Sequence, residues 1–391
     1  MLRISDAQRR ARLARRHALA APAGSVEAAT AAMTCLHATE PASVHLAAFA
    51  RSGAAIEEVD RALYDDRTVV KQLAMRRTVF AFPRDLLPAV WGSAAARVAA
   101  QQRARLARDV EKAGIAADGP RWVEGTTSAV LALLHERGPM TTVELRGLMP
   151  ELDSRIVVSP GQPYGGEFPV APRVLTTLAA SGAVVRGSNE GGWKTSRPRW
   201  TPTADWVEVG PPLTEEEGYA TLVRSWLHTF GPGTEDDLVW WLGATKAAVR
   251  RALGDVEAVE VRLDHATGWL LPDDLPGSSA DSADEPVEPW AALLPALDPT
   301  TMGWKDRSFF LGDHAERLFD ANGNAGPTAW WDGRIVGGWT QRGDGTVVVV
   351  PAEPLDRAAT RAFEATADRL TAWLDGDVVK SIYQSPLVRG L

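Results

Sequence analysis

The sequence is poor in cysteine and contains no long apolar run. Cys35 is the only cysteine among 391 residues, which excludes an intramolecular disulfide and a cysteine-rich zinc site. No segment approaches the roughly 18 consecutive apolar residues of a membrane-spanning helix. The N-terminus is rich in arginine and has no signal-peptide core. We therefore expect a cytoplasmic protein that does not interact with membranes.

The signatures of several enzyme classes are also missing. We find no phosphate-binding loop, no Rossmann fingerprint and no Ser-His-Asp pattern, which disfavours nucleotide-dependent and acyl-transfer chemistry. His37 and His45 are eight residues apart, without a third ligand at a useful spacing. Cys35 lies in an apolar stretch and is expected to be a small buried residue rather than a nucleophile. We predict that the protein uses neither a metal nor a cofactor.

Acidic residues outnumber basic ones, for a net charge of −8, but the two signs are unevenly distributed. Residues 1–112 hold 18 Lys and Arg against 11 Asp and Glu, whereas residues 206–300 hold 5 against 18. The basic N-terminal third could follow a phosphate backbone, and the acidic middle could not. The predicted DNA contacts are Arg12, Arg16, Arg51, Arg76 and Arg77. The alternative is a solvated, arginine-rich helix face.

The chain is longer than the roughly 250–300 residues that one core supports, so several domains are expected. In residues 1–112, apolar spacing predicts helices at 5–19, 26–36, 41–51, 56–64 and 67–74, then a strand at 77–82 and a long helical stretch from 85. Helices followed by a strand with basic residues are typical of a winged helix, a fold that docks on DNA.

The same outline recurs twice. Residues 113–210 predict helices at 122–136, 143–148 and 172–181, an irregular loop at 161–166 and a wing with two arms within 184–195. Residues 211–276 predict a helix at 245–253 and a wing formed by 259–263 and 268–271. The two units share a Gly-Pro-x-Thr motif 93 residues apart, with a capping threonine three residues before an acidic residue. The acidity of the last unit indicates a protein-facing or structural role rather than DNA contact.

The remaining chain predicts a linker at 277–289 and a small module at 290–391. Short strands are expected at 309–311, 327–331, 334–340 and 346–350, before a final helix at 356–374. The predicted fold class is thus mainly α with β wings: three tandem winged-helix units and a C-terminal β-rich, α+β or barrel-like module. The fifteen tryptophans are expected to serve core and inter-domain packing.

The segment 36–41, L-H-A-T-E-P, is the candidate site. An apolar helix precedes it, and Pro41 suits the first turn of the next helix, which Gly53 ends. A tight joint between two helices would point His37, Thr39 and Glu40 outward from one corner. The alternatives are a histidine that only favours the helix dipole and a threonine that only caps the next helix.

Four segments carry a resemblance to a known family. They are H-A-T-E-P at 37–41, R-R-T-V-F-A-F-P at 76–83, F-D-A-N-G-N-A-G-P-T at 319–328 and D-G-R-I-V-G-G-W at 332–339. With the tandem winged helices, they make the chain resemble the winged-helix DNA glycosylase superfamily of the AlkZ and YcaQ/AlkX type. In that family the corner carries Gln-x-Gln or Gln-x-Asp, and His37 and Thr39 stand at the matching positions.

The resemblance implies a monofunctional glycosylase, by default a monomer associated with the nucleoid, that hydrolyses the N-glycosidic bond of cationic alkylpurines in duplex DNA. Bulky adducts and interstrand crosslinks are within the expected range. We expect His37 to orient or deprotonate a water, Thr39 to hold it, and Glu40 to tune the histidine or stabilise positive charge. The alternative is a non-catalytic winged-helix DNA-binding protein, either a damage binder or a transcriptional regulator.

Overall fold

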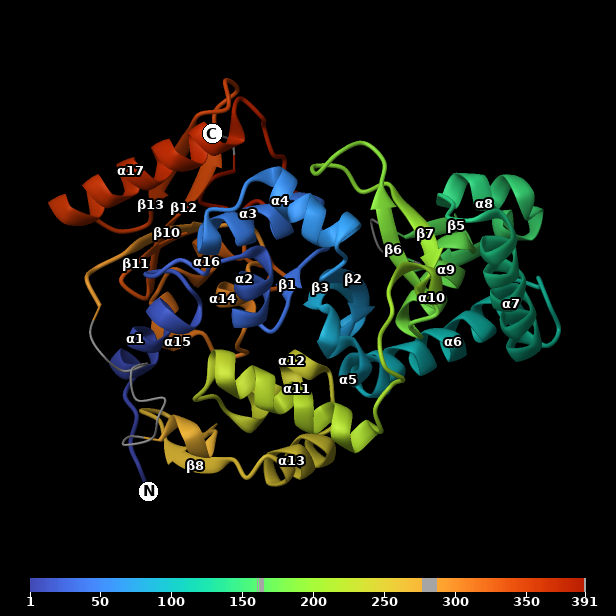
Figure 1. Ribbon diagram of the computed structural model, residues 1–391, viewed down its shortest axis with the longest axis horizontal. Helices are drawn as coiled ribbons and strands as arrows, with labels where there is room; N and C mark the ends of the chain where they lie inside the picture. Colours follow the sequence, from blue (N-terminus) through green and yellow to red (C-terminus); the bar gives the residue numbers. More distant parts are fainter. Residues whose placement is uncertain (160, 162–164, 276–286, 390–391) are drawn as a thin grey trace.

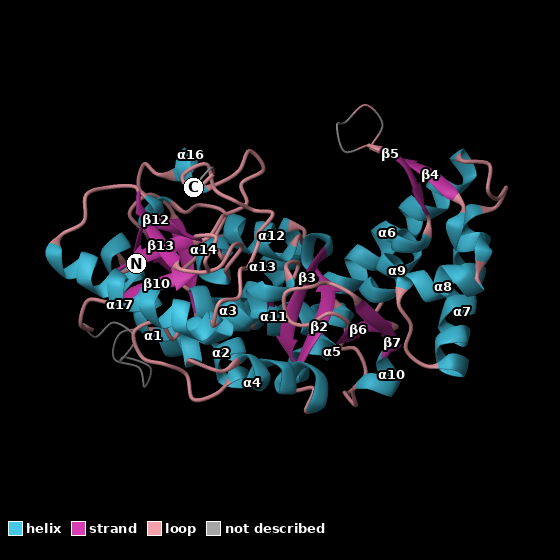
Figure 2. Ribbon diagram, turned by 90° about the horizontal axis from the view of Figure 1, so that it is seen from above, coloured by secondary structure: helices cyan, strands magenta, loops and turns pink. Residues whose placement is uncertain are grey.

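The structure is a computed structural model that describes residues 1–159, 161, 165–275 and 287–389. Residues 94–206 form a lobe on one side, while the N-terminal, third and C-terminal parts pack together on the other (Figure 1). Seen from above, strands of the first and second units lie next to one another (Figure 2), and β2 contacts β6. Residues 162–164 of the loop predicted at 161–166 and residues 277–286 of the linker predicted at 277–289 lie outside the described residues.

The first unit combines short helices with a three-stranded antiparallel sheet of order β1-β3-β2. Its elements are α1 (Asp6–Arg16), α2 (Val26–Ala32), β1 (Leu36–His37), α3 (Pro41–Ser52), α4 (Ile56–Asp60), the π-helical turn η1 (Arg61–Asp65), β2 (Val69–Ala74), η2 (Met75–Arg77) and β3 (Thr78–Pro83). The helix predicted at 67–74 is wrong, because this segment is strand β2. All six residues of β2 are buried, so the alternating pattern of a half-exposed strand is absent from the sequence.

The candidate corner is not a joint between two helices. Helix α2 ends at Ala32 rather than at residue 36, and Thr34 takes a positive φ of 61°. The chain then pairs with β3, placing Leu36 opposite Ala81 and His37 opposite Phe80. As predicted, Cys35 is buried, Pro41 begins α3, and Gly53 ends it in a left-handed conformation.

The second unit contains the predicted helices and one hairpin more than expected. The connecting stretch before it, the end of residues 1–112, contains η3 (Arg84–Leu86), α5 (Leu87–Gly92) and α6 (Ala94–Lys112). The second unit itself contains α7 (Gly119–Arg137), α8 (Thr142–Leu148), η4 (Pro150–Asp153), β4 (Arg155–Val158), β5 (Gly166–Pro169), α9 (Ala171–Ala180), β6 (Val184–Asn189), β7 (Pro198–Pro202) and α10 (Thr203–Trp206). The long helical stretch predicted from residue 85 breaks at Ser93. The second arm of the wing begins at Pro198, so Trp193 and Lys194 lie in the connecting loop.

The third unit agrees closely with the prediction. It contains α11 (Glu215–Phe230), α12 (Glu235–Leu242), α13 (Lys246–Asp255), the antiparallel pair β8 (Val259–Arg262) and β9 (Thr267–Leu270), and η5 (Pro272–Asp274). Both predicted capping boxes form, between Thr141 and Glu144 and between Thr234 and Asp237. The two units therefore start equivalent helices in the same way.

The C-terminal module is an open antiparallel sheet of order β10-β11-β12-β13, not a barrel, within the described residues. Helix α17 packs on its edge strands. The elements are β10 (Ala291–Leu294), α14 (Pro299–Met302), α15 (Ser308–Leu311), α16 (Ala315–Leu318), β11 (Thr328–Trp331), β12 (Arg334–Gln341), β13 (Val347–Pro351) and α17 (Arg357–Leu374). The strand predicted at 309–311 is instead the helical turn α15. Trp304 and Trp330 are fully buried, in line with the packing role expected for the tryptophans.

A buried ion pair joins the first unit to the C-terminal module. Arg51, at the end of α3, donates to both carboxylate oxygens of Asp298 at 2.7 and 2.9 Å, and both side chains are 0% exposed. Arg51 also donates to the hydroxyl of Thr300, which lies 2.9 Å from Nδ1 of His17. The other ring nitrogen of His17 bonds the carbonyl of Thr229 in α11. One polar network thus connects the first unit, the third unit and the C-terminal module.

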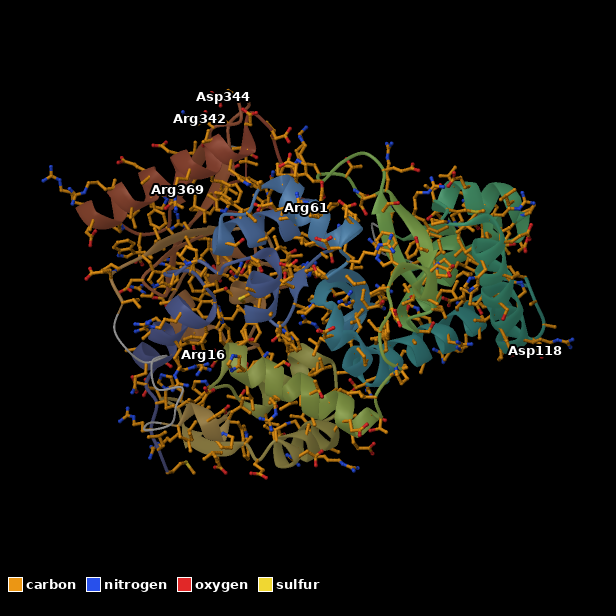
Figure 3. The ribbon with its side chains drawn as sticks, viewed as in Figure 1. Arg16, Arg61, Asp118, Arg342, Asp344 and Arg369 are labelled. Carbon is orange, nitrogen blue, oxygen red and sulfur yellow. The ribbon has the colours of Figure 1, made fainter. Side chains whose placement is uncertain are left out.

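We expect Arg51→Met to destabilise the protein by about 3–5 kcal/mol, because the change leaves the Asp298 carboxylate buried without its partner. The measurement is the midpoint of urea unfolding for the full chain. Arg369→Met on α17, an exposed position (Figure 3), is the control and should shift the midpoint little. Equal midpoints for the two variants would contradict a structural role for the ion pair.

Candidate active site and DNA-binding face

His37 lies on β1, where the sheet determines which way its ring faces. The ring meets Phe80 edge-on at a centroid distance of 5.4 Å. Nδ1 accepts a hydrogen bond from the backbone N–H of Thr39 at 3.4 Å. In a neutral imidazole one nitrogen accepts and the other carries the proton. The contact with Thr39 therefore favours the tautomer in which Nε2 bears the hydrogen.

The surroundings of His37 keep it neutral. Burial, together with the positive charge of Arg76, lowers the pKa of His37 to about 3. At neutral pH the side chain then presents an N–H donor at Nε2, much as a glutamine amide would. This geometry favours the water-orienting role expected for His37 over the deprotonating one.

Thr39 is partly exposed, and its hydroxyl forms no hydrogen bond with any described residue. The alternative in which Thr39 caps the next helix does not hold. The residue at the N-cap position of α3 is Glu40, and its side chain makes no capping bond. The Thr39 hydroxyl is therefore available for a substrate or a water.

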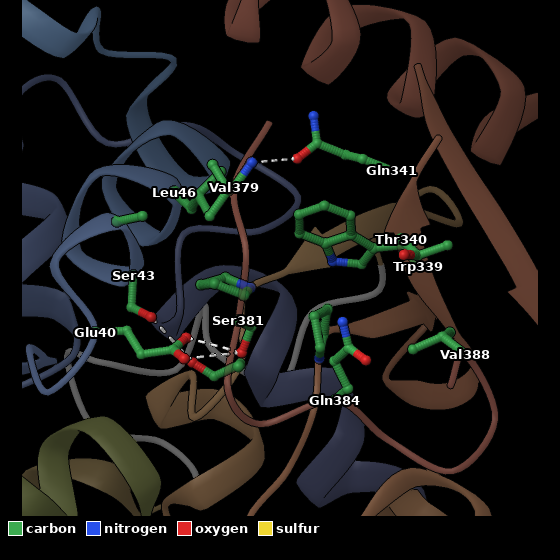
Figure 4. A pocket seen from close by; sticks show the side chains of 14 residues that line it. Glu40, Ser43, Leu46, Trp339, Thr340, Gln341, Val379, Ser381, Gln384 and Val388 are labelled. Atoms are coloured by element: carbon green, nitrogen blue, oxygen red, sulfur yellow. Dashed lines mark hydrogen bonds between the residues drawn. The ribbon is translucent and has the colours of Figure 1, made fainter. Parts of the chain in front are cut away.

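Glu40 belongs to a different environment from His37. Its carboxylate accepts from the Ser381 hydroxyl at 2.9 and 3.0 Å and from the Ile382 backbone N–H at 2.6 Å (Figure 4). Burial raises the pKa of Glu40, although these hydrogen bonds oppose the shift. Within the described residues, Glu40 bonds neither His37 nor Thr39. The sequence pattern missed this role because Ser381 is far away along the chain.

A small cavity lies behind Glu40, between α3 and the C-terminal residues (Figure 4). Its volume is about 40 Å³, enough for about three waters at roughly 10–15 Å³ each. Ser43, Gln341 and Gln384 contribute polar groups to its wall. Apolar side chains such as Leu46, Trp339 and Val388 line the rest, so this side of the corner is a partly open cavity of mixed character.

Three of the predicted DNA contacts are engaged inside the protein. Arg12 and Arg51 are 2% and 1% exposed. Arg16 bonds both oxygens of Asp274 at 2.7 and 3.0 Å and the carbonyl of His228. These guanidinium groups cannot reach a phosphate without breaking the interior, so we withdraw all three as DNA contacts.

Arg76 and Arg77 occupy the tip of the hairpin formed by β2 and β3, and both are exposed. Their φ angles of 54° and 61° place two consecutive non-glycine residues in the left-handed region. Such conformations cost about 1–2 kcal/mol per residue and often mark functional sites. The hairpin thus presents two arginines in a strained tip next to β1.

Two further arginines, which the sequence analysis missed, lie near this tip. The pKa of Arg173, near the start of α9, is lowered by burial and by the positive charges of Arg105 and Arg77. Neither Arg77 nor Arg173 forms an ion pair within the part of the chain that the structure describes. Arg77 and Arg105 therefore both lie within electrostatic reach of Arg173, while Asp109, which pairs with Arg105 at 3.8 Å, offsets part of this positive charge. We call Arg77, Arg105 and Arg173 the basic cluster. No spacing in the sequence could have revealed it, because the cluster depends on how the units pack.

In the described ranges, no three His, Cys, Asp or Glu side chains are placed to hold a metal ion. No helix there has the length and apolar character needed to cross a membrane.

The fold is shared with a DNA glycosylase. The structure of AlkZ from Streptomyces sahachiroi superimposes with a TM-score of 0.71, covering 97% of this chain and 98% of that chain at 21% sequence identity. The family model "DNA glycosylase AlkZ-like" matches residues 30–373. The chain therefore belongs to the AlkZ-like DNA glycosylase family. No curated protein matches it.

We expect His37 to remain neutral from pH 5 to pH 8, because its lowered pKa of about 3 lies well below this range. The measurement is an NMR titration of the imidazole signals, with His37→Gln used to assign the resonance. A midpoint near the usual value of about 6.5 would contradict the burial and the tautomer described for this residue.

Proposed function

We propose that the protein is a monofunctional DNA glycosylase that hydrolyses the N-glycosidic bond of cationic alkylpurines in duplex DNA. The observation that carries the proposal is the corner itself. A neutral imidazole and an unbonded hydroxyl lie two residues apart, next to exposed arginines, in a member of a DNA glycosylase family.

In the proposed hydrolysis, the protein does not have to protonate the departing base. An alkylated purine that already carries a positive charge can leave as a neutral base, so a general acid is not required. The water oxygen bonds to C1′ as the C1′–N bond breaks, and the proton of the water passes to solvent. The Nε2–H of His37 and the hydroxyl of Thr39 would hold this water against a sugar that develops positive charge. Glu40 would act at longer range and through the position of α3.

DNA binding would use the predicted units as winged helices. We assign residues 1–112, 113–210 and 211–276 to three such units, and the DNA contacts to Arg76, Arg77, Arg105 and Arg173. The acidic third unit would support the others rather than follow phosphates. Because His37 and Thr39 are both partly exposed, the corner suits bulky or crosslinked adducts that cannot enter a tight pocket. The enzyme would act as a monomer on chromosomal DNA in the cytoplasm.

One observation favours a second candidate function. The corner has neither glutamine of the family motif, and neither His37 nor Thr39 hydrogen-bonds to a carboxylate in the described residues. A protein that binds damaged DNA without excising the base would tolerate these changes. Excision assays separate the two functions directly.

We expect the purified protein to release N7-alkylguanine from duplex DNA, leaving alkali-labile sites that appear as breaks on a denaturing gel. His37→Ala and Thr39→Ala should each reduce the single-turnover rate by about 10²-fold or more, in the range of a lost catalytic hydrogen bond. His135→Ala, an exposed histidine on α7, is the matched control. Intact DNA with retained lesion binding would favour the damage-binding alternative.

The cluster of Arg77, Arg105 and Arg173 should control DNA affinity. We expect each change to glutamine to weaken binding of undamaged duplex and to lower the slope of log affinity against log salt by about 0.9. Arg369→Gln should leave both quantities unchanged. If the three variants bind as tightly as the control, the basic cluster does not contact DNA.

A further inference from the structure

Two arginines from distant parts of the chain meet at one tryptophan. The guanidinium of Arg76 lies 4.0 Å from the ring centroid of Trp240 on α12, and that of Arg307 lies 5.3 Å from the same centroid. Arg307 also stacks on Phe319 at 4.7 Å. The hairpin tip of the first unit, a helix of the third unit and the C-terminal module therefore converge here. Trp240 therefore contacts both cations.

Neither cation has a carboxylate partner among the described residues. Arg76 forms no hydrogen bond with any of them. Arg307 donates to the backbone carbonyls of Trp304 and Gly323 and to the sulfur of Met302. The nearby Asp237 accepts instead from Thr234 and from the backbone N–H groups of Lys305 and Asp306. The site therefore has an excess of positive charge.

Both guanidinium groups are destabilised as cations, mainly by burial. Burial lowers the pKa of Arg76 to about 10. Burial and then the charge of Arg76 lower the pKa of Arg307 to about 10, while Asp237 opposes the shift. A guanidinium group that is destabilised by burial, and in Arg307 also by a neighbouring cation, would gain from an anion beside it.

The backbone conformation at the hairpin tip also helps to position Arg76. Its positive φ of 54° is paired with that of Arg77. At Gly243, the residue that ends α12, a Cβ would stand 3.4 Å from Cγ of Arg76. The end of α12 and the side chain of Arg76 therefore lie in van der Waals range of each other. Arg76 is nonetheless exposed and Arg307 is partly exposed, so a ligand can reach both.

We infer that Arg76 and Arg307, held on Trp240, form a clamp for a single DNA phosphodiester next to the damaged nucleotide. This inference rests on the proposed glycosylase function, and it assigns Arg307 and Trp240 a role that the corner and the basic cluster do not cover. The anion is a phosphate because Arg76 has an unbonded guanidinium fork among the described residues, and Nη1 and Nη2 of Arg307 each keep one N–H beyond the bonds given above. The clamp lies near the corner, because Arg76 lies in η2, which directly precedes β3, and β3 pairs with β1 at His37 and Phe80. It would place the sugar of the lesion against His37 and Thr39.

The test is a binding cycle that does not require excision. Duplexes carry one N7-alkylguanine on a 2′-fluoro sugar, which resists base loss, and one neutral methylphosphonate that is moved along the phosphates flanking the lesion. For the wild-type protein, one position should weaken binding clearly more than its neighbours. In Arg76→Gln and in Arg307→Gln this extra loss should disappear, and the slope of log affinity against log salt should fall by about 0.9.

The controls separate the clamp from general effects. Arg369→Gln should retain the full methylphosphonate effect, and Arg307→Lys, which keeps the charge and loses the fork, should retain part of it. Circular dichroism and the thermal midpoint establish that each variant is folded, and Arg76→Gln tests the clamp independently at an exposed position. Methylphosphonate effects that are the same in the wild type and in both glutamine variants would overturn the clamp.

Two further outcomes are decisive. If inorganic phosphate at millimolar concentration raises the thermal midpoint of the wild type while no methylphosphonate position matters, the site holds free phosphate and the clamp is overturned. If the cycle succeeds and excision is absent, the clamp stands and the proposed glycosylase activity fails.

Discussion

The arrangement of the corner depends on the buried pair between Arg51 and Asp298. Arg51 ends α3, the helix that begins directly after His37, Thr39 and Glu40. Asp298 starts α14, and its neighbour Thr300 connects the pair to His17 and, through it, to α11. Both charges are fully buried, so each requires the other. The position of the corner relative to the third unit and the C-terminal module is thereby fixed from the far end of α3, while Ser381 and Ile382 hold its near end through Glu40.

The uneven distribution of charge along the chain is explained partly by contacts between the units of the protein, and not by DNA binding alone. The basic first helix and the acidic third unit pack on each other. Arg3 pairs with Asp264 and Arg16 with Asp274, while Arg9 stacks on Phe309 of the C-terminal module at 3.6 Å. Part of the positive charge that pointed to DNA is therefore used to join the units. Sequence composition measures the charge of a segment, but it cannot tell whether the partner is a phosphate or another part of the same chain.

Secondary structure could be predicted from the sequence where it depends on residues close together in the chain. The capping boxes of α8 and α12, the strand at β3, the hairpin of β8 and β9 and the last helix all follow from spacing and capping residues. Prediction failed where a distant segment decides. Strand β2 is buried on both faces, β1 forms only because β3 lies beside it, and Glu40 is held by residues more than 300 positions later. The residues of the corner could be named from the sequence, but the separation of Glu40 from His37 could not.

The positive charge near the corner would disfavour the proposed reaction, and a phosphate of the bound DNA could neutralise part of it. In the proposed reaction the sugar becomes positive, and the positive charge of Arg76 near His37 would on its own raise the barrier. A cationic base would be repelled for the same reason. A phosphodiester held between Arg76 and Arg307 removes one unit of that excess and leaves a negatively charged group close to the developing cation. A free alkylated base lacks this phosphate, and an intact strand carries it. In the proposed arrangement, an alkylated base within a DNA strand is therefore a better substrate than the free base, because the strand supplies the phosphate that offsets the positive charge near His37 and Thr39.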